Sequence, residues 1–416
     1  MKFSRPLRIG VLGAGQRGFI LAGLIASHPH LAEVTAVAEP RPAYREQFAG
    51  EFGVDPEYAF ASWQEFLLRF PPVDAVIITT LDRDHVGPAV ACLLRGVPIL
   101  LEKPIAPTWE EVLDIQRAQV ASGALAAVCH SLRYQPGFNL VKQLVQSGRL
   151  GEVRTLDLIE QVGYWHFAHS YIRGNWGNSG RATPLLLAKS CHDLDYIGWL
   201  MNEPCRQVAS YGQLSHFHAA RAPEGAPKRC LDACPVEHEC AYSAVRQYVQ
   251  GDRFSWPASV ISHDHTQEAH IEALRTGPYG VCVYHTDNDV VDHQTVMLEY
   301  AQGATATFTV TGFTHSGGRR LRVNGTEADL TFDEQVVTVK NYATGRIEEL
   351  RAGGEGPHGG GDLRVIRHWL EAVRRDDASW LLTDLEASLH SHAVGFAAER
   401  ARLDRRLVDV AEIYHP

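Results

Sequence analysis

The strongest constraint on the fold lies near the N-terminus, where a glycine-rich turn separates an apolar run from an amphipathic one. In "LRIGVLGAGQRGFILAGLIA", residues 7–12 read as a short buried strand, and a helix with one apolar face follows the Gly13-x-Gly15-x-x-Gly18 turn. In this setting Gly13 permits a tight turn, Gly15 lets a pyrophosphate approach the backbone, and Gly18 lets helix and strand pack closely. The N–H groups at the helix start bind phosphate. The motif predicts a dinucleotide site that includes Gly13, Ala14, Gly15, Gln16, Arg17 and Gly18.

A second apolar run supplies the acidic residue that such a site requires. "EVTAVAEP" reads as a strand ending at Glu39, about 20 residues beyond the glycines. A carboxylate there accepts hydrogen bonds from the adenosine ribose hydroxyls and repels a 2′-phosphate, so NAD is favoured. Arg41 lies two residues further on and partly neutralises that repulsion, which leaves NADP as the less favoured alternative.

The next segments repeat the alternation of strand and helix. "VDAVIITT" (73–80) and "VPILLEKP" (97–104) read as strands on either side of a helix over residues 85–95. This spacing is typical of a parallel, doubly wound sheet, whose ligand lies at the carboxyl ends of the strands. Further cofactor contacts are therefore expected from the residues at two strand ends, namely Thr79, Thr80, Leu81, His85, Glu102 and Lys103.

The overall composition limits the class of protein. A chain of 416 residues exceeds the size at which one core keeps growing, so two domains are expected. The net charge of −10, with no long basic run, disfavours nucleic acid or an anionic membrane as the main partner. No apolar run approaches the roughly 18 residues needed to span a bilayer. We expect a cytoplasmic protein with no nucleic-acid or membrane partner.

Beyond about residue 128 the pattern changes to strands that alternate apolar and polar residues. "GEVRTLDLIEQVG" and "DHQTVMLEYAQGATATFTVTGF" are two examples, and Gly-containing turns separate the strands. The pattern predicts an open, mainly antiparallel sheet with one covered face. We therefore expect an α/β dinucleotide-binding domain of the Rossmann type over residues 1–128 and an α+β domain over residues 129–416. An insertion rich in Pro, Cys and His interrupts the second domain at about 204–280.

An unusual cluster of ionisable residues lies in the apolar stretch "LLLAKSCHDLDYIGWL" (185–200), which reads as a helix. Residues three apart on a helix are neighbours, so Lys189, His192 and Asp195 form a row on one face, while Cys191 points elsewhere. The spacing argues against a Cys–His metal pair and favours a catalytic face.

Several of these segments together resemble the Gfo/Idh/MocA family, which includes glucose–fructose oxidoreductase and inositol dehydrogenase. The resemblance rests on the glycine motif, Glu39, "EKP" at 102–104, "RYQPGFNLVKQLVQSGRLGEV" (133–153) and "TDLEASLHSHAVGFAAERAR" (383–402). It implies that the open sheet of the second domain meets the cofactor cleft. In relatives a His on the helix corresponding to 185–200 lies over the nicotinamide, and His192 matches it. Many relatives also carry an Asp four residues before that His, where this chain has Ala188 with Lys189 beside it.

The resemblance implies hydride transfer between a CH–OH carbon of a sugar or cyclitol and the nicotinamide ring. His192 would accept the hydroxyl proton, Lys103 would stabilise the developing charge on the oxygen, and Lys189 would replace the missing Asp as an electrostatic partner. Asp195 completes the catalytic set. Substrate contacts are expected from the post-domain loop, from the aromatic segment 163–176 and from the start of a later strand: Arg133, Tyr134, Trp165, His169, Arg173, Trp176 and His293.

A cluster of cysteines lies within the insertion. "RCLDACPVEHEC" places Cys230, Cys234 and Cys240 in a turn-rich segment, and in a reducing compartment such a cluster favours a metal. Structural zinc needs a fourth ligand, for which Cys282 or His238 is available. An iron–sulfur cluster, a disulfide with a spare thiol and reduced thiols stay open as alternatives.

Two functions other than net dehydrogenation stay open at this point. Some proteins that resemble the family use NAD as a recycled oxidant to cleave glycosidic bonds by oxidation and elimination, and a non-catalytic NAD(H)-binding sensor is the other alternative. The absence of an acid at Ala188 favours these two alternatives, whereas Lys103 and His192 argue against a sensor. By analogy with the family we expect a homodimer or homotetramer formed through the open sheet.

Overall fold

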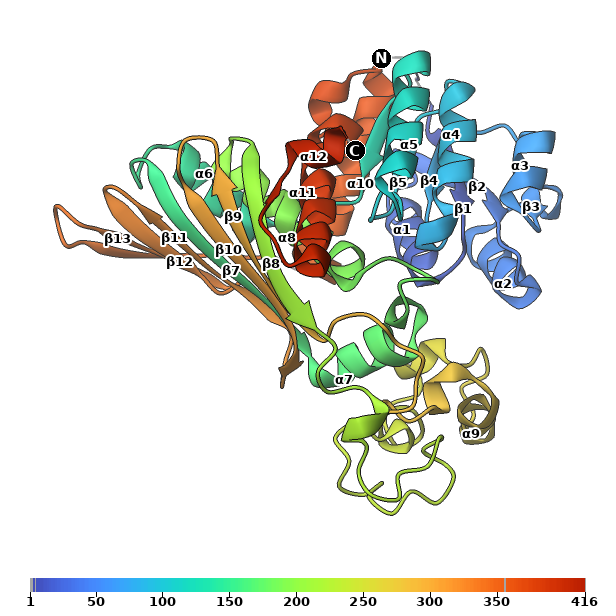
Figure 1. The fold of residues 1–416 in the computed structure, drawn as a ribbon. Coiled ribbons are helices and arrows are strands. Elements are labelled where there is room, and N and C mark those ends of the chain that lie inside the picture. The colour runs from blue at the N-terminus through green and yellow to red at the C-terminus, as the bar shows by residue number, and fades with distance from the viewer. Residues whose placement is uncertain (1–2, 4, 355–356, 416) are drawn as a thin grey trace.

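The computed structural model describes Phe3, residues 5–354 and residues 357–415, and it contains two sheets that lie side by side (Figure 1). The first sheet is parallel, in the order β3-β2-β1-β4-β5-β6. Its strands are β1 (Leu7–Leu12), β2 (Ala32–Ala38), β3 (Ala59–Phe60), β4 (Ala75–Ile78), β5 (Ile99–Leu101) and β6 (Ala126–Val128). Its helices are α1 (Gln16–Ala26), α2 (Pro42–Phe52), α3 (Trp63–Arg69), α4 (Val86–Leu94) and α5 (Trp109–Ser122).

Both faces of the first sheet are buried, which explains why its strands are apolar almost throughout. Leu7, Ile9 and Val11 of β1 share one apolar cluster with residues of α1. Leu12 faces the other way and packs in the cluster that contains residues of α4 and α5. Helices on both faces of a parallel sheet make the doubly wound fold, so this part of the prediction is confirmed.

One helix of the first domain comes from the far end of the chain. Helix α10 (Gly361–Arg375) packs beside α1 on the first sheet, and Figure 1 shows its orange ribbon among the blue and cyan helices. Trp369 is fully buried there, and its indole N–H donates to the carbonyl of Ile99. The first sheet ends with Val128, where the domain boundary was expected, yet residues 361–375 complete its covering layer.

The second sheet is mixed and mainly antiparallel, in the order β14-β13-β12-β11-β7-β10-β9-β8-β15. Among the described strands of this sheet, only β7 and β10 pair in parallel, and all other neighbouring strands are antiparallel. Its strands are β7 (Val153–Gly163), β8 (Cys205–Gln213), β9 (His293–Tyr300), β10 (Thr305–Thr314), β11 (Gly318–Gly325), β12 (Ala328–Phe332), β13 (Val336–Asn341), β14 (Ile347–Arg351) and β15 (Val408–Asp409). The expectation of an open, mainly antiparallel sheet is thereby confirmed.

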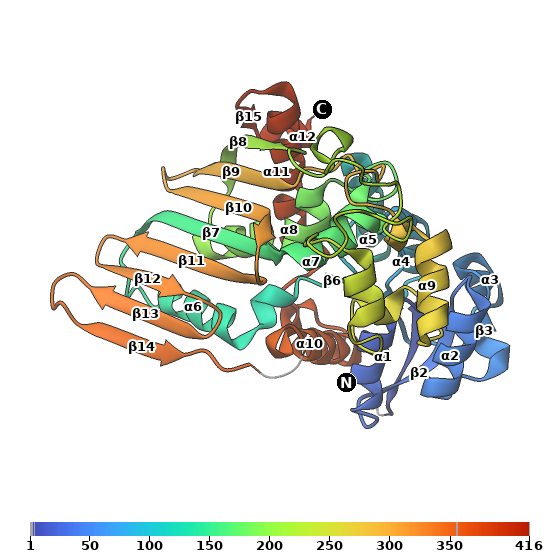
Figure 2. The ribbon, with the colours of Figure 1, turned by 90° about the horizontal axis from the view of Figure 1, so that it is seen from below.

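Helices cover one face of this second sheet and leave the other bare (Figure 2). The covering helices are α6 (Pro136–Gln146), α8 (Leu185–Met201) and α11 (Leu385–Asp404), and α12 (Ala411–Tyr414) follows α11. On the bare face Tyr211 and Met297 are 69% and 54% exposed. Helix α8 is the expected helix over 185–200, and it lies between the second sheet and the first domain.

The insertion lies between β8 and β9, at residues 214–292, and forms a separate lobe (Figure 1). Residues 205–213, which were expected to belong to it, form β8 because they alternate buried and exposed side chains along an edge of the sheet. The lobe contains α9 (Gln267–Thr276) and a small apolar cluster of its own around Tyr248 and Leu274. It touches the first domain through the rings of Tyr44 and His263, whose centroids are 5.7 Å apart.

Among the described residues, we find no helix that combines the length and the apolar character needed to cross a bilayer.

Candidate active site between the two domains

The turn between β1 and α1 has the shape that a pyrophosphate requires. Gly13 has a φ of +97°, and a Cβ there would lie 2.6 Å from the carbonyl oxygen of Thr79. A Cβ at Gly18 would lie 2.2 Å from the carbonyl oxygen of Gly13, so only glycine allows this packing. At Gly15 the nearest atom to such a Cβ is 3.9 Å away, which leaves the backbone open to a ligand. Helix α1 has no side-chain cap, so its first N–H groups are available for phosphate.

Glu39 lies directly after β2, beside this turn. Its carboxylate accepts a hydrogen bond of 2.9 Å from the N–H of Ala14 and one of 2.7 Å from Nε of Arg41. Burial opposes ionisation of Glu39, but the hydrogen bonds from Arg41 outweigh burial and lower the pKa of the carboxyl. The Arg41 guanidinium lies 3.8 Å from the centroid of the Tyr44 ring. Glu39 is thus an ionised group at the position expected for the adenosine ribose.

Arg17 and Glu102 were both expected to contact the cofactor, and in the structure they form an ion pair with each other. Nε of Arg17 donates to Glu102 at 2.6 Å, and its two terminal nitrogens donate to Asp362 at the start of α10 at 2.8 and 3.1 Å. Through these two contacts Arg17 joins the glycine turn to the end of β5 and to α10. Asp362 was not among the expected site residues, because nothing in its local sequence indicates that α10 returns to the first domain.

The four residues expected after β4 have different surroundings. Thr79 donates to the carbonyl of Gly13 at 2.6 Å, and Thr80 donates to the carbonyl of Asp84 at 3.0 Å. His85 is buried, with Nδ1 2.8 Å from the carbonyl oxygen of Pro104. Leu81 is 49% exposed. Thr79 and His85 therefore hold the glycine turn and the end of β5 in place.

Lys103 joins the end of β5 to α8. Its Nζ donates to the carbonyl oxygen of Ala188 at 2.8 Å. Lys189 and His192 follow Ala188 on the same helix. The contact therefore joins the end of a strand in one domain to a helix of the other.

Asp195 has a separate role. Both of its carboxylate oxygens accept hydrogen bonds of 2.7 Å from the guanidinium of Arg133, and both residues are buried. Burial opposes ionisation of Asp195, but the charge of Arg133 outweighs it and lowers the pKa of the carboxyl. Arg133 also donates to the carbonyl of Leu382 at 2.8 Å. The pair joins the loop after β6 to α8 and to the start of α11.

Lys189 reaches toward β7. Its Nζ lies 3.0 Å from Oε1 of Glu160, which also accepts a hydrogen bond of 2.8 Å from Arg319. Arg319 in turn binds Asp193 through Nε at 2.5 Å. Burial opposes ionisation of Glu160, but Arg319 and Lys189 lower its pKa to about 2. Sequence reasoning missed Glu160, although its position on the buried face of an alternating strand is a detectable signal.

Two aromatic residues beside Trp165 were also missed, His166 and Trp256. The ring centroids of His166 and Trp256 are 4.7 Å apart, and those of Trp165 and Trp256 are 5.4 Å apart. Burial and the charge of Lys189 lower the pKa of His166 to about 3, so it is neutral at pH 7. Trp256 comes from the insertion, where the sequence gives no periodic signal. The insertion thus contacts the segment after β7.

The other expected substrate residues are tied to neighbouring elements. His169 lies 3.0 Å from the hydroxyl of Tyr248, and Arg173 donates to the carbonyls of Val281 and Tyr242 at 2.7 Å each. The remaining contacts are as follows: the hydroxyl of Tyr134 accepts from the N–H of Leu382 at 2.9 Å, the indole of Trp176 donates to Asp82 at 3.2 Å, and Nδ1 of His293 lies 2.8 Å from Asp292.

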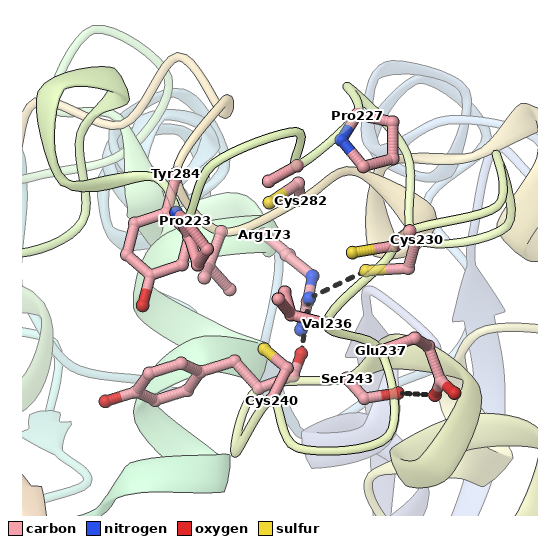
Figure 3. Close-up of a pocket in the computed structure, with 14 residues that line it drawn as sticks. Arg173, Pro223, Pro227, Cys230, Val236, Glu237, Cys240, Ser243, Cys282 and Tyr284 are labelled. Atoms are coloured by element: carbon pink, nitrogen blue, oxygen red, sulfur yellow. Dashed lines mark hydrogen bonds between the residues drawn. The ribbon is translucent and has the colours of Figure 1, made fainter.

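The structure brings the four expected cysteines to one cavity, but not in a metal-binding arrangement. Cys230, Cys234, Cys240 and Cys282 all line it, together with Arg173 (Figure 3). Over residues 5–354 and 357–415, no group of three or more His, Cys, Asp or Glu side chains is arranged so that it could hold a metal ion. The expected zinc site is therefore not supported.

Arg173 gives a physical reason for this result. Its guanidinium reaches in among the thiols and lies 3.6 Å from Sγ of Cys230 (Figure 3). Burial also raises the pKa of Cys240 and of Cys282, which favours thiols over the thiolates that a metal requires. All four cysteines are free, and the segment is held by hydrogen bonds such as the one from the N–H of Cys230 to the carbonyl of Gly280, 2.9 Å.

Comparison with known proteins shows the family to which the two domains belong. A family model described as "Oxidoreductase family, NAD-binding Rossmann fold" matches residues 7–130, and the model of that family's C-terminal α/β domain matches residues 142–410. The Bacillus subtilis protein YteT is 24% identical over 380 residues, which is 86% of each chain. An inositol 2-dehydrogenase of Paenarthrobacter aurescens is 29% identical over 213 residues, 49% of this chain and 58% of that relative.

Solved structures with the same fold include levoglucosan dehydrogenase in complex with NADH and L-sorbose. It superposes with a TM-score of 0.74 at 17% identity, over 98% of this chain and 99% of that chain. An oxidoreductase of Agrobacterium radiobacter, solved with NAD+, L-tartaric acid and magnesium, gives a TM-score of 0.73 at 14% identity, over 98% and 99% of the two chains. With both family models matched along most of its length, the chain belongs to the Gfo/Idh/MocA family of NAD-binding oxidoreductases.

Proposed function

We propose that this protein is an NAD-dependent oxidoreductase that transfers a hydride between a CH–OH carbon of a sugar or cyclitol and the nicotinamide ring. Family membership supports the NAD-dependent chemistry. The substrate class is supported by relatives that are named inositol 2-dehydrogenases and by the fold shared with levoglucosan dehydrogenase.

One contact carries the proposal, the hydrogen bond from Nζ of Lys103 to the carbonyl of Ala188. It places a cation at the carboxyl end of β5, where a doubly wound sheet binds its ligand. The same contact brings that strand end to the turn of α8 that carries Lys189 and His192. The contact supports Lys103, Lys189 and His192 as the groups that would surround the reacting end of a dinucleotide.

The residues have separate roles in the mechanism. NAD, when bound, supplies the hydride acceptor at its nicotinamide. His192 takes the proton of the reacting hydroxyl, for which an imidazole has a suitable pKa near neutrality. Lys103 donates to the same oxygen and stabilises the negative charge that develops on it. Lys189, held by Glu160, contributes a second positive charge beside the site.

The glycine turn and Glu39 would bind the other half of the cofactor. The backbone at Gly15 is open to the pyrophosphate, and the ionised Glu39 favours a ribose with free hydroxyls over a 2′-phosphate. We therefore propose NAD as the main cofactor. Because Arg41 binds Glu39 and is half exposed, NADP remains the weaker alternative.

The substrate would meet the aromatic side of the site. Trp165 and His166 follow β7, and Trp256 of the insertion packs against both. Ring faces bind the C–H faces of sugars, and a neutral imidazole both donates and accepts hydrogen bonds. Arg133 and Tyr134 hold the loop after β6 behind the site through their contacts with Asp195 and Leu382.

Incubation of the full chain with NAD and a panel of sugars, sugar acids and cyclitols tests the proposal, with NADH absorbance as the readout. Net NADH formation with at least one compound is the expected result. Cleavage of a glycoside without net NADH would instead identify the redox-recycling reaction. Binding of NAD with neither reaction would identify a non-catalytic NAD(H)-binding protein.

A further inference from the structure

His130, just beyond the end of β6, is a buried titratable residue to which the mechanism above gives no role. Its side chain is fully buried, at 0% exposure. Within the described part of the chain, neither Nδ1 nor Nε2 of its ring has a hydrogen-bond partner. A buried polar atom without a partner costs free energy, so two such atoms on one side chain require an explanation.

The His130 ring lies between two other imidazoles. Its centroid is 5.5 Å from that of His192, with the two rings nearly perpendicular at 80°, and 5.5 Å from that of His392. His392 is already satisfied, because Nε2 accepts a hydrogen bond of 3.0 Å from the N–H of Ile105 and Nδ1 lies 3.0 Å from the carbonyl of Ser388. His192, on α8, is the other ring that lies beside His130.

His130 is neutral in this environment. Burial lowers its pKa, the charges of Arg133 and Lys103 act in the same direction, and Asp195 and Glu102 oppose them. These groups face it from the loop after β6, from the end of β5 and from α8, while His392 faces it from α11. A neutral imidazole carries one N–H and one free lone pair, so His130 can accept one hydrogen bond.

We propose that His130 is a positioning residue for His192, and that its ring nitrogen accepts a hydrogen bond from His192 once His192 holds the proton of the substrate hydroxyl. The inference rests on the proposed function of His192 as the proton acceptor. With the rings 5.5 Å apart, rotation of the side chains brings two nitrogens to the roughly 3 Å of a hydrogen bond. No atoms are exchanged, and the proton stays on His192.

The neighbouring charged groups differ from His130 in what they offer to a protonated imidazole. Both carboxylate oxygens of Asp195 are bound to Arg133, and Lys103 and Lys189 are cations that repel a charged imidazole. A hydrogen bond to a charged group inside a protein is stronger than one between neutral groups. The lone pair of His130 thus raises the proton affinity of His192 at the step where that affinity is used.

Three variants of the full chain test the inference. His130→Phe keeps a ring but removes the acceptor, and His130→Asn restores an acceptor without the ring. His392→Gln changes the other neighbour of His130 while keeping an acceptor for the N–H of Ile105. The readouts are kcat, KM and their pH profile, the affinity for NAD, the melting temperature, and the titration of the His192 ring followed by NMR and assigned with His192→Gln.

With His130→Phe we expect kcat to fall about tenfold, while KM and the affinity for NAD stay within twofold. The acid limb of kcat/KM and the ring titration of His192 should both move about one pH unit lower, because one hydrogen bond to a charged group is lost. His130→Asn should recover most of the activity. His392→Gln should lower the melting temperature but leave the acid limb in place.

Two outcomes would contradict the inference. If His130→Phe has wild-type kcat and an unmoved acid limb, the ring matters only for packing. If the His192 titration is the same in wild type and His130→Phe, no hydrogen bond joins the rings. The NMR readout needs no turnover, so an enzyme that oxidises no sugar would overturn the proposed function while the pairing of the two rings is still decided.

Discussion

At the residue scale, Asp195 shows how much a helical pattern can and cannot reveal. The three-residue spacing of Lys189, His192 and Asp195 places them on one face of α8. Spacing does not reveal the partner on the other element, and Asp195 binds Arg133 from the loop after β6. We therefore assign Asp195 to the structural support of the site rather than to proton transfer.

Removing one member of that buried pair should be costly. Asp195→Ala leaves Arg133 as a buried charge without a carboxylate, and we expect it to lower the free energy of unfolding by about 3–5 kcal/mol. Urea unfolding at pH 7 measures this. Asp114→Ala, at an exposed position on α5, is the matched control and should change the free energy by less than about 0.5 kcal/mol. Equal effects of the two substitutions would contradict the assignment.

The same pair predicts a pH dependence of stability. The folded-state pKa of Asp195 is lowered, so the unfolded state binds its proton at higher pH than the folded state does. The contribution is therefore complete above the unfolded pKa, near pH 4, and is lost as the pH falls through the folded value. The stability difference between wild type and Asp195→Asn should shrink between about pH 4 and pH 2. A constant difference over that range would argue against an ionised Asp195.

Lys103 should act on the reaction and hardly at all on cofactor binding. Lys103→Met removes the donor to the developing oxyanion and should lower kcat by about 10²–10³-fold. The affinity for NAD should stay within twofold, since the glycine turn and Glu39 lie at the other half of the cofactor. Steady-state kinetics and a fluorescence titration with NAD separate the two effects, and Lys340→Met on β13 is the control. Unchanged kcat in Lys103→Met would remove Lys103 from the mechanism.

At the element scale, α10 shows why the boundary of a domain is hard to predict from sequence. The parallel sheet follows from local patterns, because the glycine motif, the apolar strands and Glu39 all lie within the first 104 residues. Residues 361–375 show a helical pattern, but no local feature reveals which sheet they cover. The contact depends on Arg17 pairing with Asp362 and on Trp369 packing beside β5, which are interactions between distant residues.

This placement makes a direct prediction about stability. Trp369 is fully buried and donates to the carbonyl of Ile99, so Trp369→Ala should lower the free energy of unfolding by about 3–5 kcal/mol and weaken NAD binding in parallel. Trp380→Ala, nearby and only partly buried, is the control. Chemical unfolding and NAD titration of the two variants measure both effects. If Trp369→Ala left NAD binding untouched at a lower stability, the packing of α10 would not support the cofactor site.

The contacts that the insertion makes with the rest of the chain could not be predicted from the sequence. Its cysteines could be recognised in the sequence, and the structure does gather them in one cavity. The guanidinium of Arg173 among them could not be foreseen, because Arg173 lies in a π-helical turn 57 residues before Cys230. Trp256 of the insertion, which packs against Trp165 and His166, likewise has no sequence motif around it.

At the scale of the whole molecule, the bare face of the second sheet is the surface for which a partner is expected. Tyr211 and Met297 lie on neighbouring strands of that face and are 69% and 54% exposed. We propose that two or four copies of the chain associate through it. The double variant Tyr211→Lys with Met297→Lys should be monomeric by light scattering, whereas Val120→Lys on α5 should keep the wild-type assembly. A monomeric wild type would contradict this proposal.

We propose that hydride passes directly between the substrate carbon and the nicotinamide ring, with Lys103, Lys189 and His192 beside the reacting atoms. The most direct measurement uses the substrate found with the panel, deuterated at its reacting CH–OH carbon, and follows the label by mass spectrometry. We expect NADH that carries one deuterium, and a rate slowed by the isotope wherever hydride transfer limits turnover. Appearance of the label in water, with unlabelled NADH, would contradict it.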